Sequence, residues 1–110
     1  MTDPDDKSAV TLTGKQKKIL KGLGHHLDPL ISIGKEGLTE NVIKATKQEL
    51  LTRELIKVKI ANSSSLNKQE AADLLPGATE STLVQLIGKT LLIYKENPRI
   101  DKEHRITLPH

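Results

Sequence analysis

The sequence predicts a two-layer α/β domain with the element order α-β-α-β-α-β-β and a four-stranded mixed sheet. Helical periodicity and short apolar runs alternate along the chain, so that two β-α-β units follow one another. Such units have right-handed crossovers, which makes the first, second and third strands parallel. A two-residue turn at Gly88-Lys89 returns the fourth strand antiparallel. We expect a disordered acidic tail over residues 1–11, the folded domain over 12–97 and a C-terminal extension over 98–110.

The first helix is predicted to begin at Thr13, which can form a capping box with Gln16. At about 100° per residue, four apolar residues fall on one narrow face of this helix. They are Leu12, Ile19, Leu20 and Leu23. The opposite arc carries Lys15, Lys17, Lys18 and Lys21. Gly22 and Gly24 end the helix, which should dock with its leucines and expose its lysines.

A turn through Asp28-Pro29 leads into the first strand, residues 30–33, and then into the glycine loop, Gly34-Lys35-Glu36-Gly37. Thr39 can cap a second helix that runs to about Thr52. One face of that helix should be buried, since its apolar and small residues repeat at helical spacing. They are Val42, Ile43, Thr46 and Leu50.

The second strand, residues 55–61, alternates apolar side chains with Lys57 and Lys59, which predicts one packed face and one open, basic face. The third helix should be stopped by Pro76-Gly77. In the hairpin that follows, Gly88 stands where a type II′ turn requires glycine. In the C-terminal extension, Ile106 and Leu108 are candidates for a short edge strand.

The composition limits the chain to one domain with a modest aliphatic core. The protein has 110 residues, a hydrophobic fraction of 35% and Tyr94 as its only aromatic residue. It has no cysteine, and no apolar run approaches the roughly 20 residues of a transmembrane helix. The first ten residues lack the features of a secretory signal. A cytoplasmic protein without a membrane partner is therefore expected.

Basic residues are concentrated at the start of the predicted domain. The formal net charge is +3, but between Thr13 and Lys35 five lysines and two histidines stand against one carboxylate, Asp28. A cluster of this kind suggests binding to a polyanion. The alternative is a solvated surface that only keeps the protein soluble.

The glycine loop has the features of a phosphate-binding loop. Glycine lets a ligand approach the backbone, and the following helix offers unpaired N–H groups and the positive end of its dipole. KH domains hold RNA with a Gly-x-x-Gly loop, and here Lys35 adds a full charge. Backbone N–H groups from Gly34 to Leu38 would hold the phosphate. An ordinary turn with two positive-φ glycines would explain the four residues alone, but the nearby lysine row favours the phosphate loop.

Other chemistry finds little support in the sequence. Residues 87–90 end like a nucleotide-binding P-loop, but Leu83 stands where that motif needs glycine, and a strand follows instead of a helix. His25-His26 lacks further ligands at zinc-site spacing, since His104 and His110 lie in the C-terminal extension. No nucleophile–base arrangement or carboxylate pair indicates catalysis. We therefore expect no enzymatic activity, metal or cofactor.

The lack of aromatic residues constrains how nucleic acid could be bound. RRM and OB-fold modules stack bases on aromatic side chains, and a single tyrosine cannot provide such a platform. Recognition would depend on phosphates, 2′-hydroxyls and shape. This favours structured RNA and predicts a strong dependence of affinity on salt.

Four blocks of the sequence resemble the CRM domain, the chloroplast RNA splicing and ribosome maturation module, in its stand-alone bacterial YhbY-type form. They are LTGKQKKILKGLGHHLDPLISIGKEGLTENVI, ELIKVKI, LVQLIGKTLLIY and RITLP, in the order found in that family. The resemblance implies a fold similar to the C-terminal domain of translation initiation factor three. It also implies RNA binding through the Gly-x-x-Gly loop and the basic first helix, and a role with precursors of the large ribosomal subunit.

On this basis the expected partner is ribosomal RNA in a large-subunit precursor. The expected contact residues are Lys15, Lys18, Lys21, Gly34, Lys35, Glu36, Gly37 and Lys89. Two rival hypotheses remain. An interaction module for an acidic ribosomal or translation factor would use the same basic face. A small phosphate-ligand enzyme would need a general base, for which only Glu36 and the histidines are near the loop. The sequence leaves the oligomeric state open.

Overall fold

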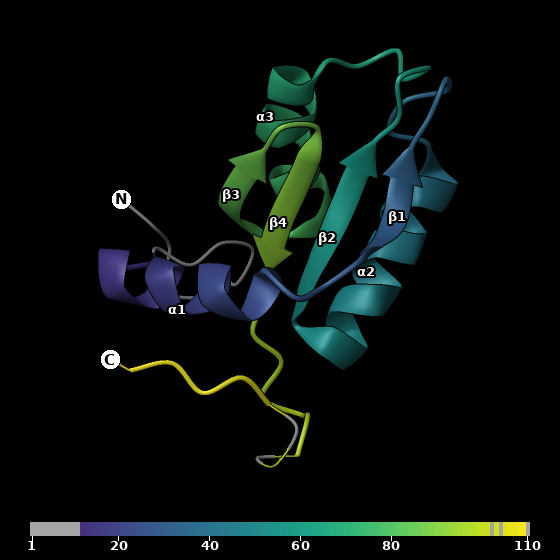
Figure 1. Cartoon of the computed structure of the whole chain (residues 1–110). Helices are drawn as coiled ribbons and strands as arrows, with labels where there is room; N and C mark the ends of the chain where they lie inside the picture. The colour runs from purple at the N-terminus through teal and green to yellow at the C-terminus, as the bar shows by residue number, and fades with distance from the viewer. Residues whose placement is uncertain (1–11, 102, 104, 110) are drawn as a thin grey trace, which may run out of the picture.

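The computed structural model describes residues 12–101, 103 and 105–109 and has the predicted order of helices and strands (Figure 1). The helices are α1 (Gly14–Gly24), α2 (Glu40–Arg53) and α3 (Lys68–Thr79). The strands are β1 (Pro29–Ile33), β2 (Leu55–Ile60), β3 (Thr82–Ile87) and β4 (Thr90–Tyr94). The acidic tail predicted for residues 1–11 lies outside the described residues. None of the described helices is long and apolar enough to cross a membrane.

The four strands form one mixed sheet in the order β1-β2-β4-β3. β1 and β2 are parallel, and β4 is antiparallel to both of its neighbours, β2 and β3. The predicted directions are therefore correct, although β4 rather than β3 pairs with β2. Because β1, β2 and β3 point the same way, their carboxyl ends and the β3–β4 turn lie along one edge of the sheet, at the top of Figure 1. We call this the loop edge.

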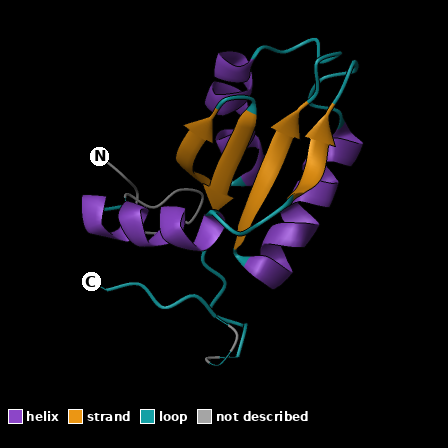
Figure 2. Ribbon diagram, viewed as in Figure 1, coloured by secondary structure: helices purple, strands orange, loops and turns teal. Residues whose placement is uncertain are grey.

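Two apolar clusters pack on opposite faces of the sheet. The main cluster joins Ile33, Val58 and Ile93 of the sheet to Leu50 of α2 and Leu75 of α3. Both helices cover this face, behind the sheet in Figure 2. The second cluster has six buried residues on the other face: Leu12, Leu20, Leu55, Val84, Leu92 and Tyr94. It lies where α1 crosses the end of the sheet opposite the loop edge.

α1 begins as predicted and buries a narrower face than predicted. The Thr13 hydroxyl accepts a hydrogen bond from the Gln16 N–H (3.1 Å), and the Gln16 side chain accepts one from the Thr13 N–H (2.9 Å). Leu20 is fully buried, but Leu23 is 47% exposed, since it lines an open groove between α1, the end of α2 and the start of β2. The lysines on the opposite arc remain accessible.

The prediction that Pro76-Gly77 stops the third helix is wrong, because α3 continues to Thr79. Proline lacks an N–H and so costs an interior helix one hydrogen bond. Burial of Leu75 and Thr79 offsets this loss, and the Thr79 hydroxyl donates to the Leu75 carbonyl at 2.8 Å. The helix ends at Glu80, a left-handed cap (φ 56°) whose N–H bonds back to the last turn.

The C-terminal extension forms no strand among its described residues. Ile106 and Leu108, the candidates for an edge strand, instead pack on the second apolar cluster. Glu54, which is fully buried at the end of α2, holds this segment. Its carboxylate accepts hydrogen bonds from the backbone N–H of Ile106 in the extension (2.8 Å) and from that of Asn97 just before it (2.7 Å). The extension is therefore anchored by side chains and not by the ladder of the sheet.

Candidate nucleic-acid interface

The glycine loop is a closed turn between β1 and α2. The Gly37 N–H donates to the Gly34 carbonyl at 3.0 Å, and the Thr39 N–H donates to the Gly37 carbonyl at 3.1 Å. The Thr39 hydroxyl then caps α2 by accepting from the Val42 N–H at 3.1 Å. Lys35 occupies the exposed tip of this turn. Its charge is thus held at the start of a helix, where the dipole also favours an anion.

The two glycines of this loop have different roles. Gly37 has φ +74°, and a Cβ placed on it would lie 2.9 Å from the Ser65 Oγ of the β2–α3 loop. Gly34 has no positive φ, and a Cβ there would meet nothing within 4 Å. The fold therefore requires glycine at 37 and leaves open space over 34. Of the two positive φ values that an ordinary turn would use here, only one occurs.

The expectation that every amide from Gly34 to Leu38 is available to a phosphate is wrong for Gly37. Its N–H is already bonded within the turn. In the described part of the chain the N–H groups of Lys35, Glu36 and Leu38 have no acceptor. Two neighbouring free amides at the tip, with the Lys35 side chain, are suited to an anionic oxygen.

The loop edge brings the hairpin apex close to the glycine loop through the end of β2. The Ile60 N–H donates to the Lys89 carbonyl at 2.7 Å, and the Ala61 N–H donates to the Ile33 carbonyl at 2.9 Å. Gly88 has φ +56° and Lys89 does not have a positive φ, as the predicted type II′ turn requires. The two Gly-Lys pairs therefore share one edge of the sheet, as the strand directions predict.

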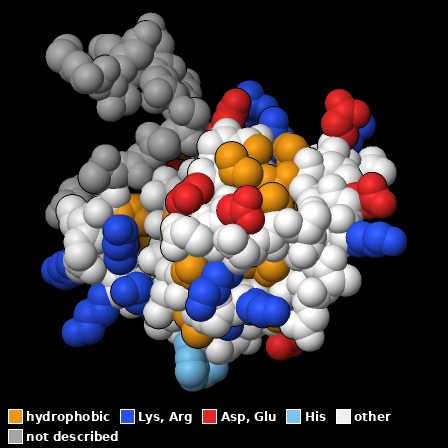
Figure 3. Space-filling model, turned by 90° about the horizontal axis from the view of Figure 1, so that it is seen from above, with side chains coloured by type: hydrophobic (Ala, Val, Ile, Leu, Met, Phe, Trp, Pro, Cys, Tyr) orange, Lys and Arg blue, Asp and Glu red, His pale blue; other side chains and the backbone are white. Residues whose placement is uncertain are grey.

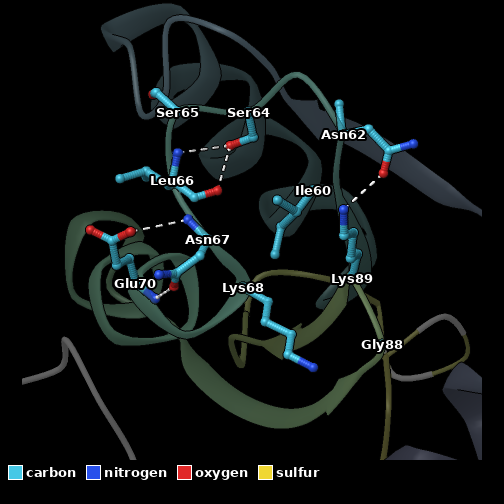
Figure 4. Close-up of a pocket in the computed structure, with 11 residues that line it drawn as sticks. Ile60, Asn62, Ser64, Ser65, Leu66, Asn67, Lys68, Glu70, Gly88 and Lys89 are labelled. Carbon is cyan, nitrogen blue, oxygen red and sulfur yellow. Dashed lines mark hydrogen bonds between the residues drawn. The ribbon is translucent and has the colours of Figure 1, made fainter.

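A hollow of about 590 Å³ opens on this edge beside the hairpin (Figure 4). Ile60 lines its base, and Lys68 and Lys89 approach from α3 and the hairpin. The Lys89 Nζ donates to the Asn62 Oδ1 at 2.8 Å, which ties the hairpin to the β2–α3 loop. Sequence reasoning missed Lys68. The signal was available, because Asn67 and Glu70 form a capping box that places Lys68 in the first turn of α3.

The α1 lysines are exposed but lie away from the glycine loop. Lys15, Lys18 and Lys21 project from a helix at the far end of the sheet, whereas the glycine loop follows the last residue of β1 (Figure 1). β1, which lies between the end of α1 and the glycine loop, is five residues and thus roughly 16 Å long. Lys35 and Lys89 thus lie on the same edge of the sheet, although they are far apart in sequence. The α1 lysines lie at the other end of the sheet, although they are near Lys35 in sequence.

The histidines provide no metal site in the described residues. His25 and His26 are exposed, with their ring centroids 5.3 Å apart at an interplanar angle of 81°. No cluster of three or more His, Cys, Asp or Glu side chains lies within reach of one ion in the part of the chain described. His104 and His110 lie outside the described residues.

Comparison of the sequence with known protein families gives a match over most of the chain. A family model described as the CRS1 / YhbY (CRM) domain matches residues 12–95. The chain belongs to the CRM-domain family. The match spans every helix and strand of the structure and includes the glycine loop, α1 and the hairpin.

Individual members of the CRM-domain family match at similar length. The chain is 43% identical over 86 residues to YqeI of Bacillus subtilis, whose name describes it as a probable RNA-binding protein, and the match covers 78% of this chain and 90% of YqeI. It is 40% identical over 99 residues to a Haemophilus influenzae protein named RNA-binding protein, covering 90% and 96% of the two chains. The solution structure of SAV1595 from Staphylococcus aureus has 46% sequence identity and a TM-score of 0.73, and the match covers 90% of this chain and all of that one.

Proposed function

We propose that this protein binds structured RNA in the cytoplasm, assists assembly of the large ribosomal subunit and catalyses no reaction itself. Its partner in this role is ribosomal RNA in a large-subunit precursor. The contact residues are those named from the sequence: Lys15, Lys18, Lys21, Gly34, Lys35, Glu36, Gly37 and Lys89. Membership of a family whose named relatives are RNA-binding proteins supports the choice of RNA over other polyanions.

The observation that carries the proposal is the geometry of the glycine loop. Free amides of Lys35 and Glu36 lie at the tip of a closed turn, the space over Gly34 is open, and Lys35 supplies the positive charge. A phosphate group needs such close backbone approach, because its oxygens accept hydrogen bonds from several donors at once. A basic surface that serves only to bind an acidic protein has no such need.

The proposed contact residues have different roles in RNA binding. Gly34 admits the phosphate, the Lys35 and Glu36 amides donate to it, and Gly37 holds the turn against the β2–α3 loop. Glu36 contributes through its backbone and keeps its carboxylate in solvent. Lys89 adds charge at the same edge, and the α1 lysines contact phosphates farther along the RNA.

Replacing Gly34 by valine is expected to weaken RNA binding without lowering stability. A Cβ at Gly34 meets no heavy atom within 4 Å, so we expect the fold to accept valine, but the new side chain stands where the phosphate approaches. Losing one hydrogen bond to a charged group costs about 1.5–3 kcal/mol, so the Kd for RNA should rise about tenfold or more. Fluorescence anisotropy with a labelled ribosomal RNA fragment and thermal unfolding of the same samples measure the two effects.

Gly77→Val is the matched control, because a Cβ at Gly77 also meets nothing within 4 Å but lies in α3, away from the glycine loop. An RNA affinity unchanged in Gly34→Val would contradict the loop contact and favour the interaction module. Gly37 is unsuited to this test. Its φ of +74° and the nearby Ser65 Oγ mean that Gly37→Ala should itself cost about 1–2 kcal/mol of stability.

A further inference from the structure

The two groups of proposed contacts leave a gap in the path of the RNA. α1 and the glycine loop lie at opposite ends of β1, a strand roughly 16 Å long. An RNA that touches both must pass over the surface between them. That surface is the part of the sheet that α1 does not cover.

One row of side chains crosses all four strands on this uncovered surface. Ser32 of β1 pairs with Lys59 of β2, Lys59 pairs with Thr90 of β4, and Thr90 pairs with Ile87 of β3. Ser32 and Lys59 are exposed, Thr90 is half-buried and Ile87 is 48% exposed. We call these four residues the open row.

The alternation of β2 places the open row on the same side of the sheet as α1. Ile56, Val58 and Ile60 belong to the cluster under α2 and α3, whereas Leu55 belongs to the cluster under α1. The side chains of Lys57 and Lys59 therefore point to the α1 side.

The cover provided by α1 ends one row short of the open row. Gly24 lies directly on Leu92, where an added Cβ would be 2.6 Å from the Leu92 Cδ2. Leu92 pairs with Lys57 in β2, and Thr90, the next residue of β4 on that face, pairs with Lys59. The open row is thus the first row of the sheet beyond α1, and half-buried Lys57 lies in the preceding row, paired with Leu92.

The two sides of the molecule differ in net charge. α1 and all four strands contain no aspartate or glutamate, whereas they carry Lys15, Lys17, Lys18, Lys21, Lys57 and Lys59. The helices on the other face are of mixed charge, because Glu40, Glu49, Glu70 and Asp73 stand beside Lys44, Lys47, Arg53 and Lys68. Seen from the loop edge, several Lys and Arg side chains lie along the side where histidine is drawn, while on the opposite side Lys and Arg are interspersed with Asp and Glu (Figure 3). A polyanion laid over the open row meets no carboxylate from the sheet beneath it.

We propose that the open row is an RNA-contact surface that connects α1 to the loop edge. Lys59, with Lys57 beside it, neutralises phosphates between those held by α1 and those held at Lys35 and Lys89. The hydroxyls of Ser32 and Thr90 bond phosphate oxygens or 2′-hydroxyls. This inference rests on the proposed function and adds to it the middle part of the RNA path, through residues that neither the sequence pattern nor the family match identifies as a site.

The test compares two double variants with equal loss of charge. Lys57→Gln with Lys59→Gln removes the lysines of the proposed surface, and Lys44→Gln with Lys47→Gln removes two exposed lysines from α2 on the opposite side. Binding of a structured ribosomal RNA fragment is titrated at several salt concentrations. Removal of one lysine–phosphate pair should lower the slope of log affinity against log salt by about 0.7–0.9, so the slope of the first variant should fall by about 1.4–1.8 and that of the control by nearly nothing.

The single variant Lys59→Gln, at an exposed position, guards against unfolding of the double variant and should show about half the fall in slope. Equal slopes in the two double variants would overturn the inference. If both bind like the wild type while replacement of Lys18, Lys21 and Lys35 weakens binding, the proposed function stands and the open row is excluded. If the wild type fails to bind RNA, the proposed function fails as well. If the Lys57→Gln, Lys59→Gln variant loses as much affinity for polyglutamate as for RNA, the open row would instead be assigned to an acidic protein.

Discussion

Replacing Lys18, Lys21 and Lys35 together by glutamine is expected to lower the affinity for structured RNA about 100-fold at low salt. Each lysine that contacts a phosphate contributes on the order of 1 kcal/mol, and 1.4 kcal/mol corresponds to a factor of ten in Kd. The slope of log affinity against log salt should fall by about 2 to 3, since the three lysines no longer displace counterions from the RNA. Filter binding or anisotropy over a salt series measures both quantities.

The geometry of the fold allows this effect to be divided. Lys18 and Lys21 lie on α1, and Lys35 lies on the glycine loop beyond β1. Because the two groups contact different phosphates, their effects on the free energy of binding should add. Lys44→Gln with Lys47→Gln is a closely matched control for the α1 pair, since both pairs are exposed and three residues apart on a helix. If replacing Lys44 and Lys47 lowers the affinity for RNA as much as replacing Lys18 and Lys21, the RNA does not bind specifically at α1.

Replacing Glu54 by alanine is expected to be strongly destabilising. Glu54 is fully buried, and its carboxylate accepts hydrogen bonds from the N–H groups of Asn97 and Ile106. Hydrogen bonds to charged groups contribute about 1.5–3 kcal/mol each, so the free energy of unfolding should fall by about 3 kcal/mol or more. For a domain of this size the Tm should drop by about 12 °C or more, measured by circular dichroism or calorimetry.

The pKa of Tyr94 provides a second way to measure the effect of the buried Glu54 charge. Burial, followed by the negative charge of Glu54, raises the pKa of Tyr94 to about 12. Because the folded state favours the neutral phenol, this contribution to stability is complete below pH 10 and is lost as the pH rises toward 12. Tyr94 is the only aromatic residue, so ultraviolet absorbance reports its ionisation alone.

Glu54→Gln removes the charge at nearly constant shape and should lower the pKa of Tyr94, while RNA affinity at low temperature stays unchanged. A Tm equal to that of the wild type in Glu54→Ala would show that Glu54 does not anchor the C-terminal extension.

Local signals in the sequence predict the elements of this fold well. Thr13 with Gln16, Thr39 and Gly88 each act within a few residues of chain, and each has the predicted role in the structure. The alternation of β2 correctly separates Val58, which is buried, from Lys59, which is exposed. These features depend only on residues close together in the sequence, so they can be predicted from one sequence alone.

Features that depend on long-range packing could not be predicted in the same way. The insertion of β4 between β2 and β3 is a choice among pairings that all satisfy the apolar pattern. Continuation of α3 past Pro76 depends on burial of Thr79, and the role of Glu54 depends on a segment more than forty residues away along the chain. For the same reason, sequence proximity wrongly placed the α1 lysines beside the glycine loop, because β1 separates them in space.

The most direct test of RNA recognition is a binding titration of the intact protein at several salt concentrations. It compares a structured fragment of large-subunit ribosomal RNA with duplex DNA of equal phosphate count. We expect the preference for RNA to persist as salt rises, because 2′-hydroxyls and the A-form shape are contacted in addition to phosphates. Equal binding to the two nucleic acids, disappearing together as salt rises, would reduce the basic side to a charged surface and contradict the proposed function.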